Sequence, residues 1–321
     1  LHRVLQRAKK TGLEIIIVTA GTLEESEDAV RLVKRFDTGK SISGGGTGTG
    51  NNTDSALPTY PRLFTTVGVH PTRCDVFQNS GDPEGYFGKL LARATERSYL
   101  LSKDNLSSKG AHDDANDAVT STGPIVAIGE CGLDYYVPLS GRVINGSGER
   151  ETAGDAISSE LSNQEKDKHE LQHKTFVAQM KMSNEFNKPI VIHTREAESD
   201  TLRLMKENLR QDAAIHVHCF TSQKWFAEEL LKHFPNLCLG FTGVVTFKNA
   251  EAVVEVVKIT PLHRILLETD GPYMAPTPKR GEIAHPGHVP YVALKIAEIK
   301  GVAVGDVLVA ARDATRRIYG I

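Results

Sequence analysis

The chain has 321 residues, enough for one large domain or two small ones, and an α/β barrel typically takes about 250. Hydrophobic residues make up 40% of it, and no run approaches the roughly 18 consecutive apolar residues of a membrane span, which argues against an integral membrane protein. The 38 basic and 40 acidic side chains give a net charge of −2, which argues against binding nucleic acid through broad basic electrostatics alone, so any phosphate needs a local binding device.

The predicted elements alternate from the start of the chain. Residues 1–10 have the spacing of a helix, Gly12 ends it, and a β-branched run follows at 13–20. Similar short runs rich in Val, Ile and Leu lie at 63–70, 124–130, 189–194, 214–219, 237–243 and 264–270. Helical spacing follows most of them, as at 170–186 and 224–234, which is typical of a parallel sheet.

These seven runs predict an α/β fold of the TIM (β/α)8 type, in one barrel domain over residues 1–321. Because the chain begins in a predicted helix, we expect the first β-strand of the barrel to lie upstream of Leu1. Three low-complexity stretches of Gly, Ser, Asn and Thr interrupt the alternation and predict surface insertions at approximately 41–60, 102–123 and 138–164.

The 4 cysteines are far apart and lack any CxxC spacing. This disfavours both a disulfide scaffold and a cysteine zinc site. The first residues also show no signal-peptide pattern. We therefore expect a reducing, intracellular location, in the cytoplasm, the nucleus or both.

Several predicted strands end in a potential metal ligand, namely Glu130, His193, His218 and Asp270. Because the carboxyl ends of barrel strands share one face, these side chains are expected to converge. Two imidazoles and two carboxylates suit Zn, Mn, Mg or Fe. Taken singly, each residue could be structural, since a strand-end His often only forms hydrogen bonds and a strand-end Asp often caps a helix. The set favours a metal centre, because helix capping does not predict imidazoles at two strand ends.

Strand parity makes a further prediction around His218. His216 lies two residues earlier, so both side chains share one face of the strand. One pleat deeper, at about 6.6 Å along the strand, His216 is expected to be a buried, hydrogen-bonded core residue and not a ligand. Cys219 is expected on the opposite face, packed against the helix layer.

The sequence motifs at the strand ends resemble those of the TatD family of metal-dependent deoxyribonucleases, which are amidohydrolase-type barrels. The matching strings are VGVHPTRC at 67–74, IGECGLDYY at 128–136, PIVIHTREA at 189–197, HCF at 218–220, GVVTFKNA at 243–250 and LLETDGPYMAPTPKRG at 266–281. HPTRC and GECGLDY are most similar to the eukaryotic branch. The resemblance extends from near residue 1 to residue 321 between the insertions.

The resemblance implies a divalent-metal-dependent deoxyribonuclease that hydrolyses DNA phosphodiester bonds, as a 3′–5′ exonuclease on single-stranded or damaged DNA. It implies two divalent ions, Mg, Mn or Zn, with Glu130 bridging them and with His193 and His218 binding one of them. Asp270 would ligate a metal and orient or deprotonate the attacking water. Glu130 and Asp270 are thus the implied catalytic residues.

Three residues are candidates for binding the substrate: His70, Arg195 and Arg280. His70 ends a strand at the same mouth, and a planar guanidinium suits a phosphate. An ordinary surface ion pair is the alternative for either arginine. Nearby aromatic residues could stack on an unpaired base or pack within the βα loops: Tyr135, Tyr136 and Tyr273.

The chain departs from the family pattern in two places. Many members carry a His-x-His pair on the first strand, which would fall before Leu1, so the second metal position lacks these ligands here. The late Asn-Glu-Pro element is replaced by Ala284-His285-Pro286, which removes a carboxylate.

Two other functions stay open beside the nuclease. The same metals can attack a carbonyl, so the barrel could be an amidohydrolase for a small cyclic amide or ester. No lysine closely follows a ligand-bearing strand as a carbamylated metal bridge, which counts against this alternative. The other alternative is a catalytically impaired binding protein without a metal centre. DNA is the expected partner and a membrane is not, while the sequence indicates no protein partner.

Overall fold

The computed structural model describes residues 1–36, 60–95, 123–136 and 163–321. Within these ranges the strands form one sheet of seven in chain order, each hydrogen-bonded in parallel to the next. They are β1 (Ile15–Val18), β2 (Arg62–Val67), β3 (Ile125–Asp134), β4 (Ile190–Arg195), β5 (Ile215–Val217), β6 (Leu237–Phe241) and β7 (Ile265–Leu267). The α/β fold and the order of the seven predicted strands are therefore confirmed.

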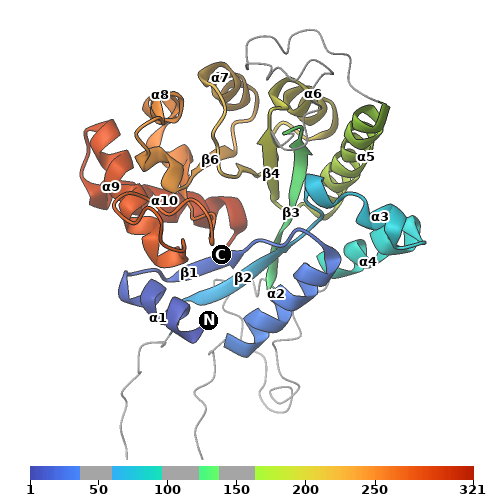
Figure 1. The fold of residues 1–321 in the computed structure, drawn as a ribbon, viewed down its shortest axis with the longest axis horizontal. Coiled ribbons are helices and arrows are strands. Elements are labelled where there is room, and N and C mark those ends of the chain that lie inside the picture. The colour runs from blue at the N-terminus through green and yellow to red at the C-terminus, as the bar shows by residue number, and fades with distance from the viewer. Residues whose placement is uncertain (37–59, 96–122, 137–162) are drawn as a thin grey trace, which may run out of the picture.

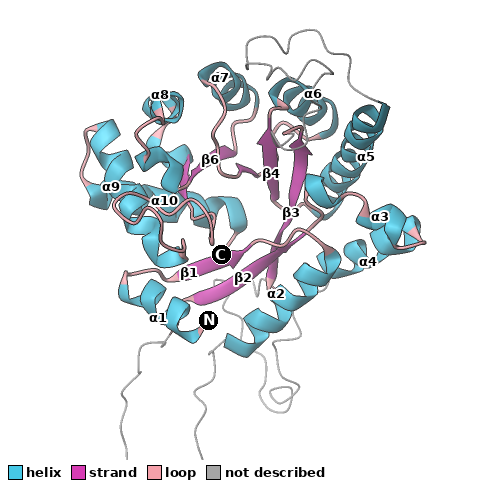
Figure 2. Cartoon of the chain, in the orientation of Figure 1, coloured by secondary structure: helices cyan, strands magenta, loops and turns pink. Residues whose placement is uncertain are grey.

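Most of the helices surround the curved sheet on its outer side (Figures 1 and 2). They are α1 (His2–Lys10), α2 (Leu23–Phe36), α3 (Val76–Asn79), α4 (Pro83–Thr95), α5 (Asn163–Phe186), α6 (Glu198–Asn208), α7 (Lys224–His233), α8 (Glu251–Ile259), α9 (Val289–Lys300) and α10 (Val304–Tyr319). Short 3-10 turns lie at η1 (Pro71–Arg73), η4 (Gly243–Thr246), η5 (Leu262–Arg264) and η6 (Pro286–His288). At least one helix lies between each two successive strands, as the crossovers of a parallel sheet usually require.

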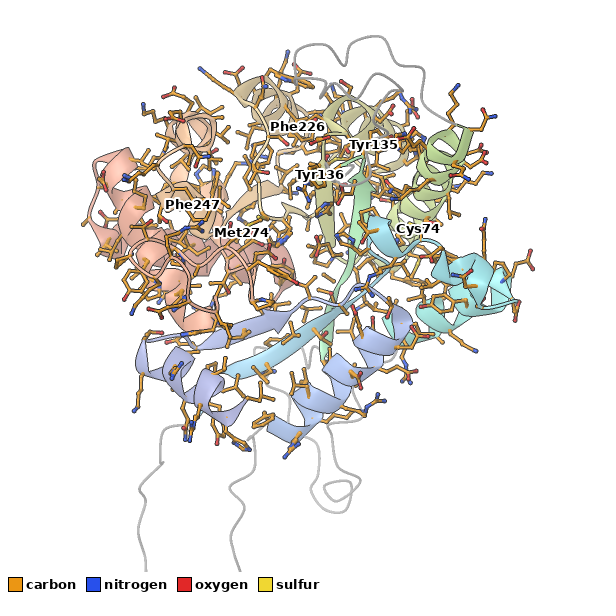
Figure 3. All side chains as sticks on the ribbon, viewed as in Figure 1. Cys74, Tyr135, Tyr136, Phe226, Phe247 and Met274 are labelled. Atoms are coloured by element: carbon orange, nitrogen blue, oxygen red, sulfur yellow. The ribbon has the colours of Figure 1, made fainter. Side chains whose placement is uncertain are left out.

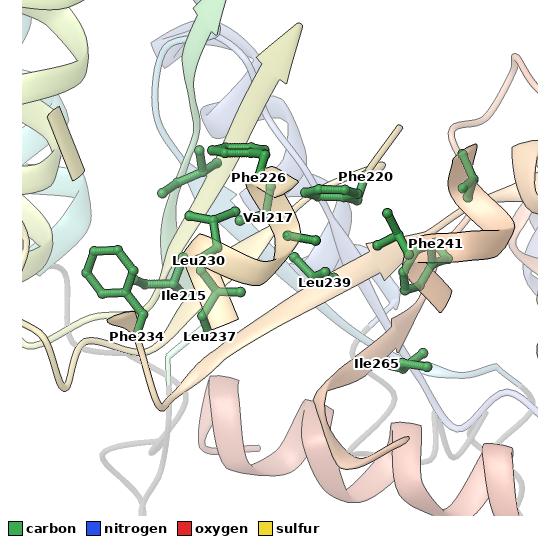
Figure 4. Packing of buried hydrophobic residues seen from close by; sticks show 14 of the residues in the cluster. Ile215, Val217, Phe220, Phe226, Leu230, Phe234, Leu237, Leu239, Phe241 and Ile265 are labelled. Carbon is green, nitrogen blue, oxygen red and sulfur yellow. The ribbon is translucent and has the colours of Figure 1, made fainter. Parts of the chain in front are cut away.

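The main apolar core lies between the strands and the helices. Ile215 and Val217 of β5 point into it and meet Phe226 and Leu230 of α7, all completely buried (Figure 4). The ring of Phe226 also stacks on Phe220 with centroids 5.8 Å apart. Burying each such side chain contributes about 1.5–3 kcal/mol, which is why the β-branched runs and the helix faces pair in this way.

A second core fills the inner side of the sheet and includes the C-terminal helix. Phe64, Val191 and Leu266 come from three different strands and pack with Ile318 and Tyr319 at the end of α10. The last turn of α10 therefore reaches the interior of the barrel. This places C-terminal residues close to the strands that carry the site.

Several sequence expectations concern residues that the structure does not describe. The three predicted insertions, apart from their last residues, fall outside the described ranges. Within the described residues no strand ladder joins β7 to β1, so the sheet is open. The strand expected upstream of Leu1 stays a prediction.

All four cysteines are among the described residues, and none of them forms a disulfide. In the described part of the chain, every helix is too short or too polar to cross a membrane.

Candidate metal centre

The four predicted ligands lie together, although they come from β3, β4 and the residues after β5 and β7. Glu130 Oε1 is 3.0 Å from His193 Nδ1 and 3.8 Å from His218 Nε2. His218 Nε2 is in turn 3.9 Å from Asp270 Oδ1. The parallel sheet thus gathers residues 140 positions apart into one cluster, with Glu130 near its centre.

His70, predicted as a substrate contact, belongs to the same cluster. Its Nε2 lies 3.7 Å from Glu130 Oε1, and ligand atoms of His70, Glu130 and His193 all lie within 4.8 Å of one another. These three residues could hold a metal ion. The other ring nitrogen of His70, Nδ1, accepts the backbone N–H of Thr72 at 3.2 Å. In a neutral ring the hydrogen is then on Nε2, which faces Glu130.

A β-bulge places Glu130. The register of β3 against β4 shifts between Ile128 and Cys131, and the ladder resumes with Cys131 opposite Ile192 and Gly132 opposite His193. Gly132 has a φ of +146°, and a Cβ there would lie 1.9 Å from the carbonyl oxygen of His193. Bulges re-aim side chains near sites. The expectation that Glu130 ends its strand was wrong, because the bulge lets β3 continue to Asp134.

Two buried carboxylates next to the imidazoles were missed from the sequence. Asp134 Oδ2 lies 3.4 Å from His193 Nε2, and Glu268 Oε1 lies 2.8 Å from His218 Nδ1. Glu268 is two residues before Asp270, so strand alternation could have placed it on the same face. The strand-end pattern indicates one ligand for each strand, here Asp270, and therefore did not indicate Glu268.

Burial and the neighbouring charges shift the pKa values of the residues in this cluster. Burial raises the pKa of Glu130, but His218 and His193 outweigh it and lower that pKa to about 2. Burial also raises the pKa of Asp270, more than His218 lowers it. Burial lowers the pKa of both ligand imidazoles, yet neighbouring carboxylates raise it above the ordinary value for His193 and well above it for His218. Burial lowers the pKa of His70 to about 4, so its ring is neutral at neutral pH.

The residues present fit a divalent cation. The Nε2 of His193 is buried and makes no hydrogen bond within the described part of the chain, although Asp134 Oδ2 lies 3.4 Å from it. A buried polar atom that makes no hydrogen bond needs an explanation. Two histidines and two carboxylates are a donor set that binds Zn, Mn or Fe, and its carboxylates suit Mg. A cation would bind the lone pairs of these imidazoles and would offset the negative charge of the neighbouring carboxylates.

Both predicted substrate arginines lie on aromatic rings. The guanidinium carbon of Arg195 is 3.5 Å from the ring centre of Tyr136, and that of Arg280 is 3.8 Å from the ring centre of Phe247. Figure 3 labels both aromatic residues. Neither arginine forms an ion pair with any residue that the structure describes. The alternative of an ordinary surface ion pair is therefore not met among these residues, and both guanidinium groups keep donors for another partner.

The three tyrosines differ in their surroundings. Tyr135 stacks on His169 with centroids 3.7 Å apart and donates its hydroxyl to Asp200 at 2.9 Å, so it packs between β3, α5 and α6. Tyr136 lies under Arg195. Tyr273 is 70% exposed and remains accessible to a ligand.

The expectations for the end of β5 were right for one residue and wrong for the other. His216 is 6% exposed and contacts the hydroxyl of Tyr319, as expected for a buried, hydrogen-bonded residue. Cys219 does not pack on the helices. Its sulfur contacts Thr242 and Met274, because β5 ends at Val217 and Cys219 lies in a turn with a φ of +43°.

Comparison with known proteins places these observations in one family. The family described as TatD related DNase matches residues 1–320. A human protein named 3′-5′ RNA nuclease TATDN2 is 41% identical over 153 residues, which are 47% of this chain and 20% of that protein. The uncharacterized metal-dependent hydrolase YcfH of Escherichia coli K12 is 34% identical over 61% of this chain and 63% of its own length. The chain thus spans less than two thirds of either relative.

Solved structures agree at the level of the fold. YJJV, a TatD homologue from Escherichia coli K12, superposes with a TM-score of 0.68 at 18% identity, over 99% of this chain and 91% of that one. A hydrolase of the TatD family from Entamoeba histolytica gives 0.66 at 21% identity, over 99% and 88% of the two chains.

Proposed function

Because the chain belongs to the TatD-related DNase family of metal-dependent hydrolases, we propose that it is a divalent-metal-dependent nuclease that hydrolyses phosphodiester bonds. The observation that carries this proposal is the cluster of Glu130 with His193, His218 and Asp270 at one end of the sheet. Acidic and imidazole ligands suit a site in which cations bind the phosphate.

The chain's own residues divide the work as follows. Glu130, His193 and His218 would hold the cation, with Glu130 shared where a second ion binds. A bound Mg, Mn or Zn ion would supply Lewis acidity, which acidifies water and neutralises charge on the phosphoryl oxygens. Asp270, whose side chain is 34% exposed, would orient the attacking water and accept its proton. Its raised pKa suits a proton acceptor.

We propose that His70 contacts the phosphoryl group and is not a metal ligand. Its Nδ1 is occupied by the Thr72 N–H, so a neutral ring presents Nε2–H as a donor. Arg195 and Arg280, each with its guanidinium carbon over an aromatic ring, would bind flanking phosphates. A guanidinium group has five N–H donors, so Arg280 keeps donors for a phosphate beside the hydrogen bond from its Nη1 to the carbonyl oxygen of Ala275.

DNA is the proposed substrate, degraded in the 3′–5′ direction from a single-stranded end. The family's description supports DNA, and exposed Tyr273 offers a surface for an unpaired base. RNA is the second candidate, because the human relative is named an RNA nuclease. The alternatives of an amidohydrolase or a metal-free binding protein predict no nucleotide release.

The test uses 5′-labelled single-stranded DNA and RNA of one sequence, with Mg or Mn and with EDTA. We expect successive shortening from the 3′ end, abolished by EDTA. Glu130→Ala and Asp270→Ala should each lower the rate by about 10²-fold or more. Glu229→Ala removes an exposed carboxylate paired with Lys206 on the outer surface and should have no effect. Full activity in Glu130→Ala would overturn the proposal.

A further inference from the structure

A buried carboxylate holds the histidine that faces the cluster. Glu268 directly follows β7, and its Oε1 accepts the Nδ1–H of His218 at 2.8 Å. The same oxygen lies 2.9 Å from Nε2 of His216, and Oε2 accepts the backbone N–H of Cys219 at 2.9 Å. Both oxygens therefore have partners within the protein.

The chain of contacts continues to the C-terminal helix. Nδ1 of His216 lies 2.5 Å from the hydroxyl of Tyr319, the last residue of α10. One assignment of hydrogens suits these contacts when both rings are neutral. Tyr319 donates to His216 Nδ1, so the hydrogen of His216 is on Nε2, which lies 2.9 Å from Glu268 Oε1 although these two atoms are not hydrogen-bonded. His218 donates through Nδ1 to the same carboxylate, and its Nε2, deprotonated as metal binding requires, faces Glu130 and Asp270.

The residues of this chain of contacts are largely buried, and the neighbouring strand leaves space for them. The side chains of Glu268 and His216 are 11% and 8% exposed, and Tyr319 is 7% exposed. Gly240 in β6 leaves room for them, because a Cβ at this position would lie 2.0 Å from Glu268 Oε2 and 2.4 Å from His216 Nε2. Such close packing limits the positions that the side chains of Glu268 and His216 can take.

We propose that Glu268, His216 and Tyr319 form a positioning chain that fixes the ring and the tautomer of His218, so that its Nε2 is presented to a divalent cation. None of the three touches the cation or the substrate. The proposal rests on the proposed metal centre and extends it by coupling that centre to the end of α10.

The protonation states support the direction of the hydrogen bonds. Burial raises the pKa of Glu268, but His218 and His216 outweigh it, so the carboxylate is anionic and accepts. Burial raises the pKa of Tyr319 well above its ordinary value, so the phenol keeps its proton and donates. A carboxylate on the far nitrogen of a ligating histidine orients the ring and increases its basicity as a ligand.

The test measures Mn²⁺ binding to the whole chain by calorimetry and by the loss of the free-Mn²⁺ electron paramagnetic resonance signal. Glu268→Gln keeps the shape but turns an N–H toward one of the donors, and should weaken Mn²⁺ binding by about 10- to 100-fold. Tyr319→Phe removes only a hydroxyl and should weaken binding by a smaller factor without changing any charge. Tyr86→Phe is its matched control, a tyrosine of equal burial that contacts Leu23 and Glu24 away from the cluster, and should bind normally.

A double variant separates positioning from general destabilisation. If Tyr319 acts through Glu268, then Glu268→Gln with Tyr319→Phe should bind Mn²⁺ no more weakly than Glu268→Gln alone. Circular dichroism of the metal-free variants checks that they are folded. Unchanged Mn²⁺ affinity in folded Glu268→Gln and Tyr319→Phe would overturn the positioning chain while leaving the nuclease proposal standing. A wild-type chain that binds no Mn²⁺, Mg²⁺ or Zn²⁺ would overturn both.

Discussion

Glu130 lies at the centre of the candidate ligands. One of its oxygens lies between the rings of His193, His218 and His70, at 3.0 to 3.8 Å. Without a cation, the imidazoles compensate its buried charge, and the carboxylate in turn favours their protonated forms. Cation binding replaces protons at the same atoms, so metal and pH act on one set of groups.

This exchange predicts a pH dependence of opposite sign for stability and metal affinity. The pKa values of His193 and His218 are raised above 6.5 in the metal-free fold. Their stabilisation is complete below about pH 6.5 and is lost as pH rises through the folded values. Metal affinity should rise over the same window, because fewer protons compete. Urea unfolding and Mn²⁺ calorimetry from about pH 6 to 9 measure both. A metal affinity that is flat over this range would contradict the ligand assignment.

Substitution of His70 distinguishes a residue that contacts the substrate from one that binds the metal. His70→Ala should keep the metal content of the wild-type chain but lower kcat by about 10²-fold, because a donor to the phosphoryl group is lost. His193→Ala should lose metal as well as activity. Elemental analysis after dialysis, beside single-turnover rates, measures both. Metal loss in His70→Ala would show that this ring is a ligand of the cation.

The sequence could predict the four central residues of the cluster because they follow apolar runs whose carboxyl ends must meet. It could not predict their partners as easily. Tyr319 is 103 residues from His216, and nothing in the pattern of α10 distinguishes a tyrosine that packs from one that also donates to an imidazole. Such partners depend on how the last helix enters the barrel.

At the scale of the element, the bulge in β3 determines where Glu130 points. Gly132→Ala places a methyl group 1.9 Å from the carbonyl oxygen of His193 in a backbone conformation that suits glycine. We expect unfolding to become easier by about 1–3 kcal/mol and Mn²⁺ binding to weaken. Thermal and urea denaturation measure the first effect, and calorimetry the second.

Gly88→Ala provides the control of opposite sign. Gly88 lies inside α4, and a Cβ there meets no atom within 4 Å. Alanine should stabilise the helix by up to about 1 kcal/mol and leave Mn²⁺ binding unchanged. Equal effects of the two substitutions would argue against a special role of the bulge.

The elements themselves were largely predictable. A short apolar run indicates a strand that is buried on both faces, and helical spacing of apolar residues indicates a helix that is buried on one face. Their ends were less so. The predicted strand at 124–130 extends to Asp134, because a ladder can resume after a bulge that periodicity does not reveal. The strand run at 214–219 is shorter, with β5 ending at Val217, because Cys219 turns away.

At the scale of the molecule, metal binding and folding should be coupled, because the ligands come from four separate parts of one sheet. A cation that binds only the folded chain stabilises it by about 2.7 kcal/mol at a concentration of 100 Kd. We therefore expect Mn²⁺ to raise the Tm by several degrees and EDTA to reverse the rise. Glu130→Ala should show no such rise. A Tm insensitive to Mn²⁺ in the wild-type chain would contradict the coupling.

The central claim is that one divalent cation binds among Glu130, His193, His218 and Asp270. Anomalous diffraction from crystals grown with Mn²⁺ tests it directly, because the anomalous signal locates the metal independently of the protein atoms. We expect a peak within bonding distance of Glu130 and both histidines, and none at this place in Glu130→Ala. A peak elsewhere, or none among these residues in the wild-type chain, would contradict the account.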